Sequence, residues 1–223
     1  FKYFPKGYDN MKYLGFALLA VLAILILLIV VAALKAVKIK AKENTSAPAI
    51  NPTKEEADDY AEKLSKMVKV PTISLRGNTD LTEFYKLHKV MEENFPLIFS
   101  KLEKTEIEGN LLFRWKGKDS SRNGLLLMGH QDVVTADEPN WEKDPFSGEI
   151  SDGNIHGRGA MDCKSTVFSE FQAIEELLAE GYEPPCDIYL ATAVDEEISG
   201  DGAPKLVNYL KEQGVHLDVA MDE

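Results

Sequence analysis

Cysteine and basic residues are scarce in this chain of 223 residues. Its two cysteines, Cys163 and Cys186, are too few for a disulfide framework, although a single bridge between them stays open. The 25 Lys and Arg residues are outnumbered by 37 Asp and Glu residues, which gives a net charge of −12. Such a chain repels phosphate backbones, so we expect no nucleic-acid partner. Internal repeats and extended low-complexity tracts are also lacking.

One long apolar run contrasts with this acidic background. Leu14 to Leu34 is a stretch of 21 residues without a charge, long enough to cross a bilayer as a helix. A buried soluble helix is rarely apolar on every face. A cleavable signal peptide is the stronger alternative, but its apolar region usually covers only about 7–15 residues. We therefore expect an uncleaved single-pass transmembrane anchor.

The anchor divides the chain into four parts. They are an N-terminal tail (1–13), the transmembrane anchor (14–34), a polar stalk (35–52) and a globular part (53–223). Because the chain begins with Phe1 and ends with Glu223 directly after an apolar run, we expect it to be a fragment. The lysines on the two sides of the anchor slightly favour an orientation in which the C-terminal side faces the cytosol. A glycosylation sequon at Asn44 would require the opposite orientation.

The globular part alternates helical and strand patterns. Thr53 and Glu56 form a capping box that predicts a helix ending near Lys69. Apolar spacing predicts three further helices, over 81–94, 166–179 and 203–213. Short apolar runs predict strands, the first two of them neighbours, over 111–115, 125–128, 188–194 and 215–221. This alternation predicts an α/β fold: a largely parallel sheet with helices on both faces.

Candidate site residues follow the predicted strands, where ligands gather in such sheets. His130 and Asp132 come directly after the apolar run 125–128, and a metal-binding imidazole needs its second nitrogen held, usually by a carboxylate. Asp162 ends a glycine-rich loop, and Glu196 and Glu197 follow the strand 188–194. Carboxylates gathered at one place repel one another unless a cation lies among them. Together with a terminal Asp-Glu pair, these residues predict a binuclear metal site.

Four segments in this order, 129–134, 141–146, 157–164 and 195–197, resemble the zinc metallopeptidase family of aminoacylase and carboxypeptidase G. Within that family the chain is most similar to the branch of carboxypeptidase S and N-fatty-acyl-amino-acid synthase/hydrolase. The resemblance runs from about Thr53 to Glu223. It implies a zinc exopeptidase-like catalytic domain, truncated before its lid domain and C-terminal part.

The resemblance implies two Zn²⁺ ions and assigns their ligands by position. His130 would bind one zinc, Asp162 would bridge both, and Glu197 would bind the other. Asp222 would complete the zinc at His130, with Glu223 as a rival for that role. The remaining ligand would be a histidine far downstream, so we expect the fragment alone to be inactive.

Two further residues receive catalytic roles from the resemblance. Asp132 would orient His130, and Glu196 would be the general base. The implied reaction is zinc-dependent hydrolysis of an amide next to a free carboxylate, as in a carboxypeptidase or N-acyl-amino-acid hydrolase. The family also implies a cis peptide bond at Asp162-Cys163. We expect no metal role for His88, a solvated or packed surface histidine, or for His156 and His216.

Substrate and location are also implied by the resemblance. The partners would be a peptide or N-acyl amino acid, the membrane through the N-terminal helix, and a second copy through the missing lid domain. The catalytic part would be lumenal, in a vacuole or lysosome-like compartment, or extracellular. The alternative hypothesis is a catalytically inactive binding protein of the same fold for peptides or lipoamino acids.

Overall fold

The computed structural model describes residues 7–38, 51–136 and 138–223. The chain divides into two compact units at the boundary between Asn51 and Pro52. The described part of the first unit is one helix, α1 (Gly7–Lys38). Within it, 25 residues from Tyr13 to Val37 are long and apolar enough to cross a membrane, with a mean hydropathy of 3.4. The predicted anchor lies inside this helix, whereas the sequon at Asn44 lies outside the described residues.

The helices of the second unit form where the sequence predicts them. The capping box is confirmed, since Thr53 Oγ1 accepts a hydrogen bond from the Glu56 amide (3.3 Å) and Glu56 Oε2 accepts one from the Thr53 amide (2.7 Å). The helix predicted over 81–94 ends at Asn94, and Pro96 begins a further short helix. The helices are α2 (Lys54–Val68), α3 (Thr82–Asn94), α4 (Pro96–Lys101), α5 (Lys164–Ala179), α6 (Gly202–Glu212) and the 3-10 turns η1 (Glu138–Asn140) and η2 (Glu196–Ile198).

Within the described residues, seven strands form two sheets. The main sheet has the order β1-β2-β6-β3-β7, and β4 pairs with β5 in a small separate hairpin. The strands are β1 (Glu103–Ile107), β2 (Asn110–Trp115), β3 (Gly124–His130), β4 (Glu149–Ser151), β5 (Asn154–His156), β6 (Ile188–Ala193) and β7 (Leu217–Asp222).

The main sheet is mixed rather than largely parallel, which corrects the sequence prediction. β3 pairs in parallel with β6 and β7, but β2 is antiparallel to both β1 and β6. The direction of β2 follows from a tight hairpin, because Glu108 and Gly109 both have positive φ values, 51° and 82°. β1 was not predicted, since its sequence is polar and largely exposed.

The predicted neighbours β2 and β3 are also not adjacent. β6 lies between them, in register with Leu111 to Trp115 on one side and Leu125 to His130 on the other. β2 and β6 are both buried along almost their whole length, and both take interior positions in the sheet.

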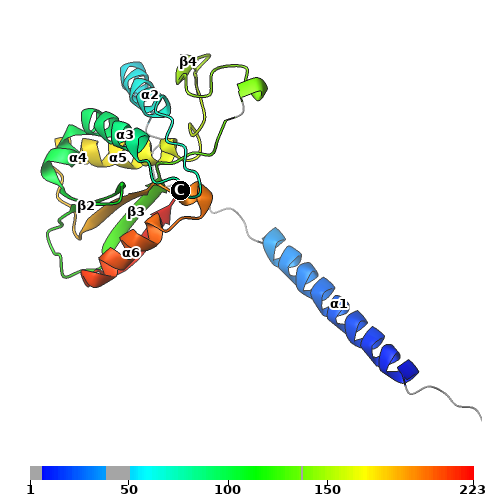
Figure 1. Ribbon diagram of the computed structural model, residues 1–223. Helices are drawn as coiled ribbons and strands as arrows, with labels where there is room; N and C mark the ends of the chain where they lie inside the picture. The colour runs from blue at the N-terminus through cyan, green and yellow to red at the C-terminus, as the bar shows by residue number, and fades with distance from the viewer. Residues whose placement is uncertain (1–6, 39–50, 137) are drawn as a thin grey trace, which may run out of the picture. The chain divides into compact units, whose positions relative to one another are not determined.

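Helices cover both faces of the sheet, as predicted (Figure 1). On one face, α2, α3, α4 and α5 pack against inward residues of β2, among them Leu111 and Phe113. On the other face, Leu206 and Leu210 of α6 pack against Leu112 and Tyr189. Both cysteines are free. The parallel strands β3, β6 and β7 therefore bring their carboxyl ends to one edge of a firmly packed layer.

Candidate metal centre

His130 is the last residue of β3 and is almost completely buried. Its Nδ1 atom donates to the backbone carbonyl of Asp132 at 2.9 Å, with the Asp132 carboxylate at 3.3 Å. Its Nε2 atom lies 3.0 Å from Asp162 Oδ1, 3.7 Å from Glu223 Oε1 and 4.0 Å from Glu196 Oε2. The imidazole thus has one nitrogen fixed by the backbone and the other directed at three carboxylates.

The protonation state of His130 determines what can lie between its Nε2 atom and the Asp162 carboxylate. A carbonyl can only accept, so Nδ1 carries a proton, and in the neutral ring Nε2 then presents a lone pair. A lone pair 3.0 Å from a carboxylate oxygen is repulsive unless a proton or a metal cation lies between them. Burial lowers the pKa of His130, but hydrogen bonds with Asp132 and Cys163 outweigh it and raise the pKa to about 12. The surroundings therefore favour a positive charge at Nε2.

Asp132 connects two parts of the site. Its fully buried carboxylate accepts hydrogen bonds from the backbone amides of Glu196 and Glu197, both at 3.1 Å, and from Ser74 Oγ at 2.5 Å. The expected contact with His130 is made mainly by the backbone carbonyl. Asp132 therefore positions the turn that carries the two glutamates as well as the imidazole. Ser74 was not predicted from the sequence, because its partner lies 58 positions away.

Asp162 reaches the site from the loop before α5. Gly159 has a φ of +79°, and a Cβ atom there would lie 2.4 Å from Val133 Cγ1, so glycine is required for this loop. The Asp162 side chain is 71% exposed, and the following peptide bond to Cys163 is cis, as the resemblance implied. The Cys163 thiol faces away from solvent, and its Sγ accepts from the His130 amide at 3.0 Å.

Glu196 and Glu197 differ in their surroundings. They begin η2, directly after Asp195, and Ser199 ends the turn with a φ of 51°. The Glu196 side chain is 52% exposed. Burial, reinforced by the charge of Asp162, raises the pKa of Glu197. Glu197 thus lies deeper among the carboxylates, and Glu196 lies nearer to solvent.

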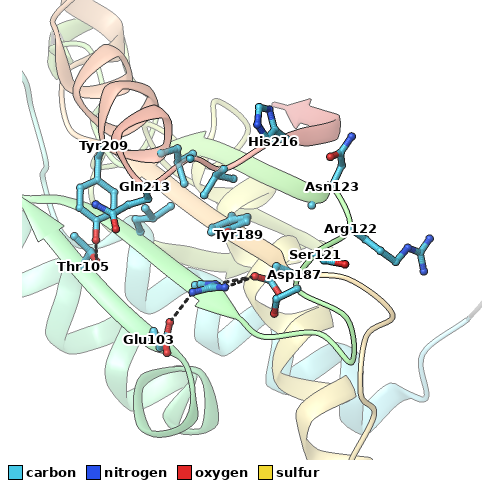
Figure 2. A pocket seen from close by; sticks show the side chains of 17 residues that line it. Glu103, Thr105, Ser121, Arg122, Asn123, Asp187, Tyr189, Tyr209, Gln213 and His216 are labelled. Carbon is cyan, nitrogen blue, oxygen red and sulfur yellow. Dashed lines mark hydrogen bonds and ion pairs between the residues drawn. The ribbon is translucent and has the colours of Figure 1, made fainter.

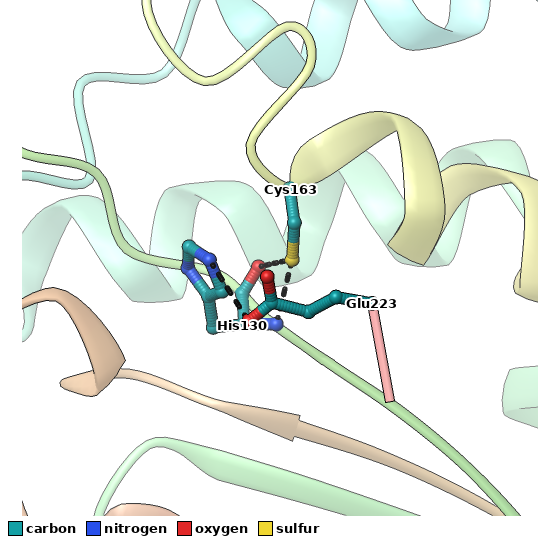
Figure 3. Close-up of side chains that lie close together, drawn as sticks. All are labelled: His130, Cys163 and Glu223. Atoms are coloured by element: carbon teal, nitrogen blue, oxygen red, sulfur yellow. Dashed lines mark hydrogen bonds and ion pairs between the residues drawn. The ribbon is translucent and has the colours of Figure 1, made fainter. Parts of the chain in front are cut away.

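At the end of β7 the structure brings Glu223, rather than Asp222, beside His130. The Glu223 amide donates to the Met128 carbonyl at 3.2 Å, and its carboxylate lies near the imidazole (Figure 3). Burial raises the pKa of Glu223, opposed by His130 and supported by Glu196, Asp162 and Asp222. Two groups of described side chains have ligand atoms within 4.8 Å of one another, His130–Asp162–Glu197 and His130–Cys163–Glu223, and neither includes Asp222.

Gln131 and His88 form a buried hydrogen-bonded pair behind the site. The sequence did not predict this pair. His88 is buried, not a surface histidine, and its Nε2 lies 2.7 Å from Gln131 Oε1. Gln131 Nε2 donates to Thr192 Oγ1 at 2.8 Å and to the carbonyls of Gly109 and Thr192. His88 follows the inward-facing Leu87 on the predicted helix, so the burial of His88 could have been predicted from the sequence. Its hydrogen-bond partner, Gln131, could not.

The chain is similar to known proteins in sequence. Residues 126–222 match the family described as Peptidase family M20/M25/M40. N-fatty-acyl-amino acid synthase/hydrolase from Danio rerio is 37% identical over 189 residues, covering 81% of this chain and 36% of the relative. Carboxypeptidase S from Saccharomyces cerevisiae is 40% identical over 167 residues, covering 68% of this chain and 29% of the relative. The chain thus spans about a third of the length of these relatives.

Solved structures support the fold. Human carnosine dipeptidase 1 aligns with a TM-score of 0.63 at 21% identity, covering 76% of this chain and 39% of that chain. An M20 family metallo-carboxypeptidase from Sulfolobus solfataricus aligns with a TM-score of 0.60 at 24% identity, covering 74% of this chain and 37% of that chain.

Proposed function

Since this chain carries a domain of the peptidase M20 family, and its relatives are named as a synthase/hydrolase and a carboxypeptidase, we propose that the protein hydrolyses an amide bond next to a free carboxylate. The substrate would be a peptide or an N-acyl amino acid, in keeping with the names of the two relatives. The observation that carries the proposal is the buried His130 Nε2 atom, which faces the Asp162 carboxylate at 3.0 Å.

The donor set fits two Zn²⁺ ions. One imidazole nitrogen and several carboxylate oxygens are ligands that zinc accepts, and in the neutral ring the Nε2 lone pair would be available to a metal ion in place of a proton. His130 would hold one ion, Glu197 the other, and Asp162 would lie between them. The last carboxylate comes from Asp222 or Glu223, and the position of Glu223 favours the latter. When bound, zinc ions activate water and polarise the carbonyl group that is attacked.

Glu196 is the proposed general base. Its carboxylate lies near the same imidazole yet is half exposed, so it can meet both a water molecule and a substrate. In the reaction its carboxylate takes a proton from the attacking water and donates it to the departing amide nitrogen. Asp132 holds the amides of Glu196 and Glu197 and thereby fixes both side chains relative to His130.

The N-terminal helix supports a second proposal, single-pass anchoring with the catalytic part lumenal or extracellular. The helix is long and apolar enough to span a bilayer. The sequon at Asn44 follows the helix closely in the sequence, so glycosylation of Asn44 reports which side of the membrane this part of the chain faces. A glycosidase-sensitive mass increase that is lost in Asn44→Gln supports this topology. Unmodified Asn44 together with cytosolic protease sensitivity of the globular part contradicts it.

Metal depletion tests the proposed activity in the longer protein that contains this chain. Chelation should abolish release of the amino acid from an N-acyl amino acid, and added Zn²⁺ should restore it. The isolated chain should bind zinc without turnover. Turnover that is unaffected by chelation would contradict the proposal. Zinc binding by the longer protein with substrate bound but never cleaved would favour the inactive binding protein.

A further inference from the structure

A second cavity lies at the end of the main sheet opposite the candidate metal centre. It encloses about 310 Å³ between the amino-terminal ends of β3 and β6 and the end of α6 (Figure 2). Gly124, at the start of β3, lines this cavity, whereas His130 ends the same strand. Seven residues of strand separate the two by about 20 Å. The cavity therefore does not belong to the proposed catalytic site.

The floor of the cavity is apolar and aromatic. Leu112, Tyr189 and Leu210, which are 3–5% exposed, form it from β2, β6 and α6. Tyr209 closes one side, and its hydroxyl accepts a hydrogen bond from Thr105 Oγ1 at 3.3 Å. A floor built from two strands and a helix is rigid, and its surface suits the ring or short chain of a small organic molecule.

The two carboxylates in the wall are already neutralised. Asp187 Oδ2 accepts from Arg114 Nε at 2.8 Å and Nη2 at 2.6 Å, and Asp187 is almost fully buried. Glu103 lies 3.4 Å from Arg114 Nη1 and 2.6 Å from Lys116 Nζ. These ion pairs leave no uncompensated negative charge in the cavity wall.

The rim carries one positive charge, that of Arg122, which is not used elsewhere. Arg122 and the imidazole of His216 are exposed at the mouth, and neither side chain has a hydrogen-bond or ion-pair partner among the described residues. Asp119 is close enough to Arg122 for its own pKa to be lowered in part by it, but the two form no ion pair. Two of the four arginines of a chain with net charge −12 therefore line one cavity. The exposed Arg122 side chain extends outward from the rim, away from Tyr189 and Tyr209 (Figure 2).

We infer that this cavity binds a small organic anion, an aromatic or short aliphatic carboxylate. Its apolar body would lie on Leu112, Tyr189 and Leu210, and its carboxylate would meet Arg122 and His216. A guanidinium pairs well with a carboxylate, and the contact is stronger where an apolar floor excludes water. The cavity would thus be a peripheral site, independent of the metals.

Three fluorinated probes of equal shape test the sign of the charge. The full chain in lipid nanodiscs is titrated with 4-fluorobenzoate, 4-fluorobenzyl alcohol and 4-fluorobenzylammonium, followed by ¹⁹F NMR against empty nanodiscs. We expect the benzoate to bind about tenfold more tightly than the ammonium, with the alcohol between them. Equal affinities, or tighter binding of the ammonium, would overturn the inference.

Variants at exposed positions then locate the site. Arg122→Gln should weaken benzoate binding about fivefold to tenfold and leave the alcohol unchanged. Gln213→Glu adds a negative charge to the lining and should weaken the benzoate while strengthening the ammonium. Arg76→Gln, which changes an exposed arginine outside the cavity, is the control and should change neither. Loss of benzoate binding in this control, or its retention in Arg122→Gln and Gln213→Glu, would contradict the assignment.

Discussion

The Nε2 atom of His130 lies 3.0 Å from Oδ1 of Asp162, although the two residues are 32 positions apart. The other ring nitrogen is held by the Asp132 carbonyl, so this contact brings a lone pair against a carboxylate unless a cation lies between. The relationship depends on the end of β3 and on the glycine-hinged loop before α5. It therefore links the fold to the proposed metal chemistry, and several predictions test its parts.

Asp132→Asn should weaken zinc binding by the full chain about 10-fold to 100-fold. The amide keeps the size of the side chain but removes the charge that holds the amides of Glu196 and Glu197. Competition against a chromophoric chelator measures the affinity. Asp152→Asn, an exposed carboxylate in the β4–β5 turn, is the matched control and should leave affinity unchanged. Equal affinities in all three proteins would remove Asp132 from the site.

A pair of variants separates Asp222 from Glu223 as the last ligand. The Glu223 carboxylate lies 3.7 Å from His130 Nε2, so Glu223→Gln should lower zinc affinity and Asp222→Asn should have the smaller effect. The measurement is the zinc affinity of each variant compared with the wild type. A larger loss in Asp222→Asn would restore the ligand expected from the resemblance and would exclude Glu223.

Gly159→Ala should destabilise the fold more than Gly153→Ala. Both glycines have positive φ, +79° and +76°, so both substitutions cost about 1 kcal/mol in backbone strain. Only at Gly159 does the new Cβ also meet a neighbour, Val133 Cγ1 at 2.4 Å, which adds about 1–3 kcal/mol. Urea denaturation gives the two free energies of unfolding. Similar losses would mean that the loop before Asp162 is not tightly packed against Val133.

Glu170→Gln should stabilise the protein in a pH-dependent manner. Burial, reinforced by the charge of Asp222, raises the pKa of Glu170 from 4.5 to about 7, and neither carboxylate oxygen has a hydrogen-bond partner. Below pH 4.5 the carboxyl is protonated in both the folded and the unfolded state. As the pH rises toward 7 the unfolded chain loses this proton first, so the stability of the wild type falls.

The expected gain for Glu170→Gln is about 3 kcal/mol at pH 8 and close to zero at pH 4. The free energy of unfolding at both pH values provides the measurement. Glu62→Gln, an exposed position on α2, is the matched control and should give the same small difference at both pH values. A gain of equal size at pH 4 and pH 8 would show that Glu170 does not carry the charge in question.

The sequence predicts those features that depend on local pattern. Three elements are specified by the sequence to within a few residues. They are the helix capped at Thr53, the helix with Phe84 and Leu87 at helical spacing, and the apolar strand β6. The order of the strands depends instead on which strand is buried on both faces. β6 is not distinguishable from β2 or β3 by its own pattern, so its central place was missed.

The candidate site was predicted as a set of residues but not as a geometry. The motif resemblance identified His130, Asp162, Glu196 and Glu197, and the structure brings them together. The contacts of Asp132 with Ser74 and with the η2 amides span about sixty positions and leave no trace in local sequence. Which carboxylate of the terminal pair faces His130 depends on the exit from β7, which the sequence alone does not fix.

Zinc content and turnover, measured together on two single variants of the longer protein, test the central claim most directly. The wild type should hold two zinc ions and release the amino acid from an N-acyl amino acid. Glu196→Gln should keep both ions and lose about 10²- to 10⁴-fold in kcat, because only the proton acceptor is removed. Glu197→Gln should lose zinc. Near-normal turnover in Glu196→Gln with two ions bound, or full zinc content in Glu197→Gln, would contradict the account.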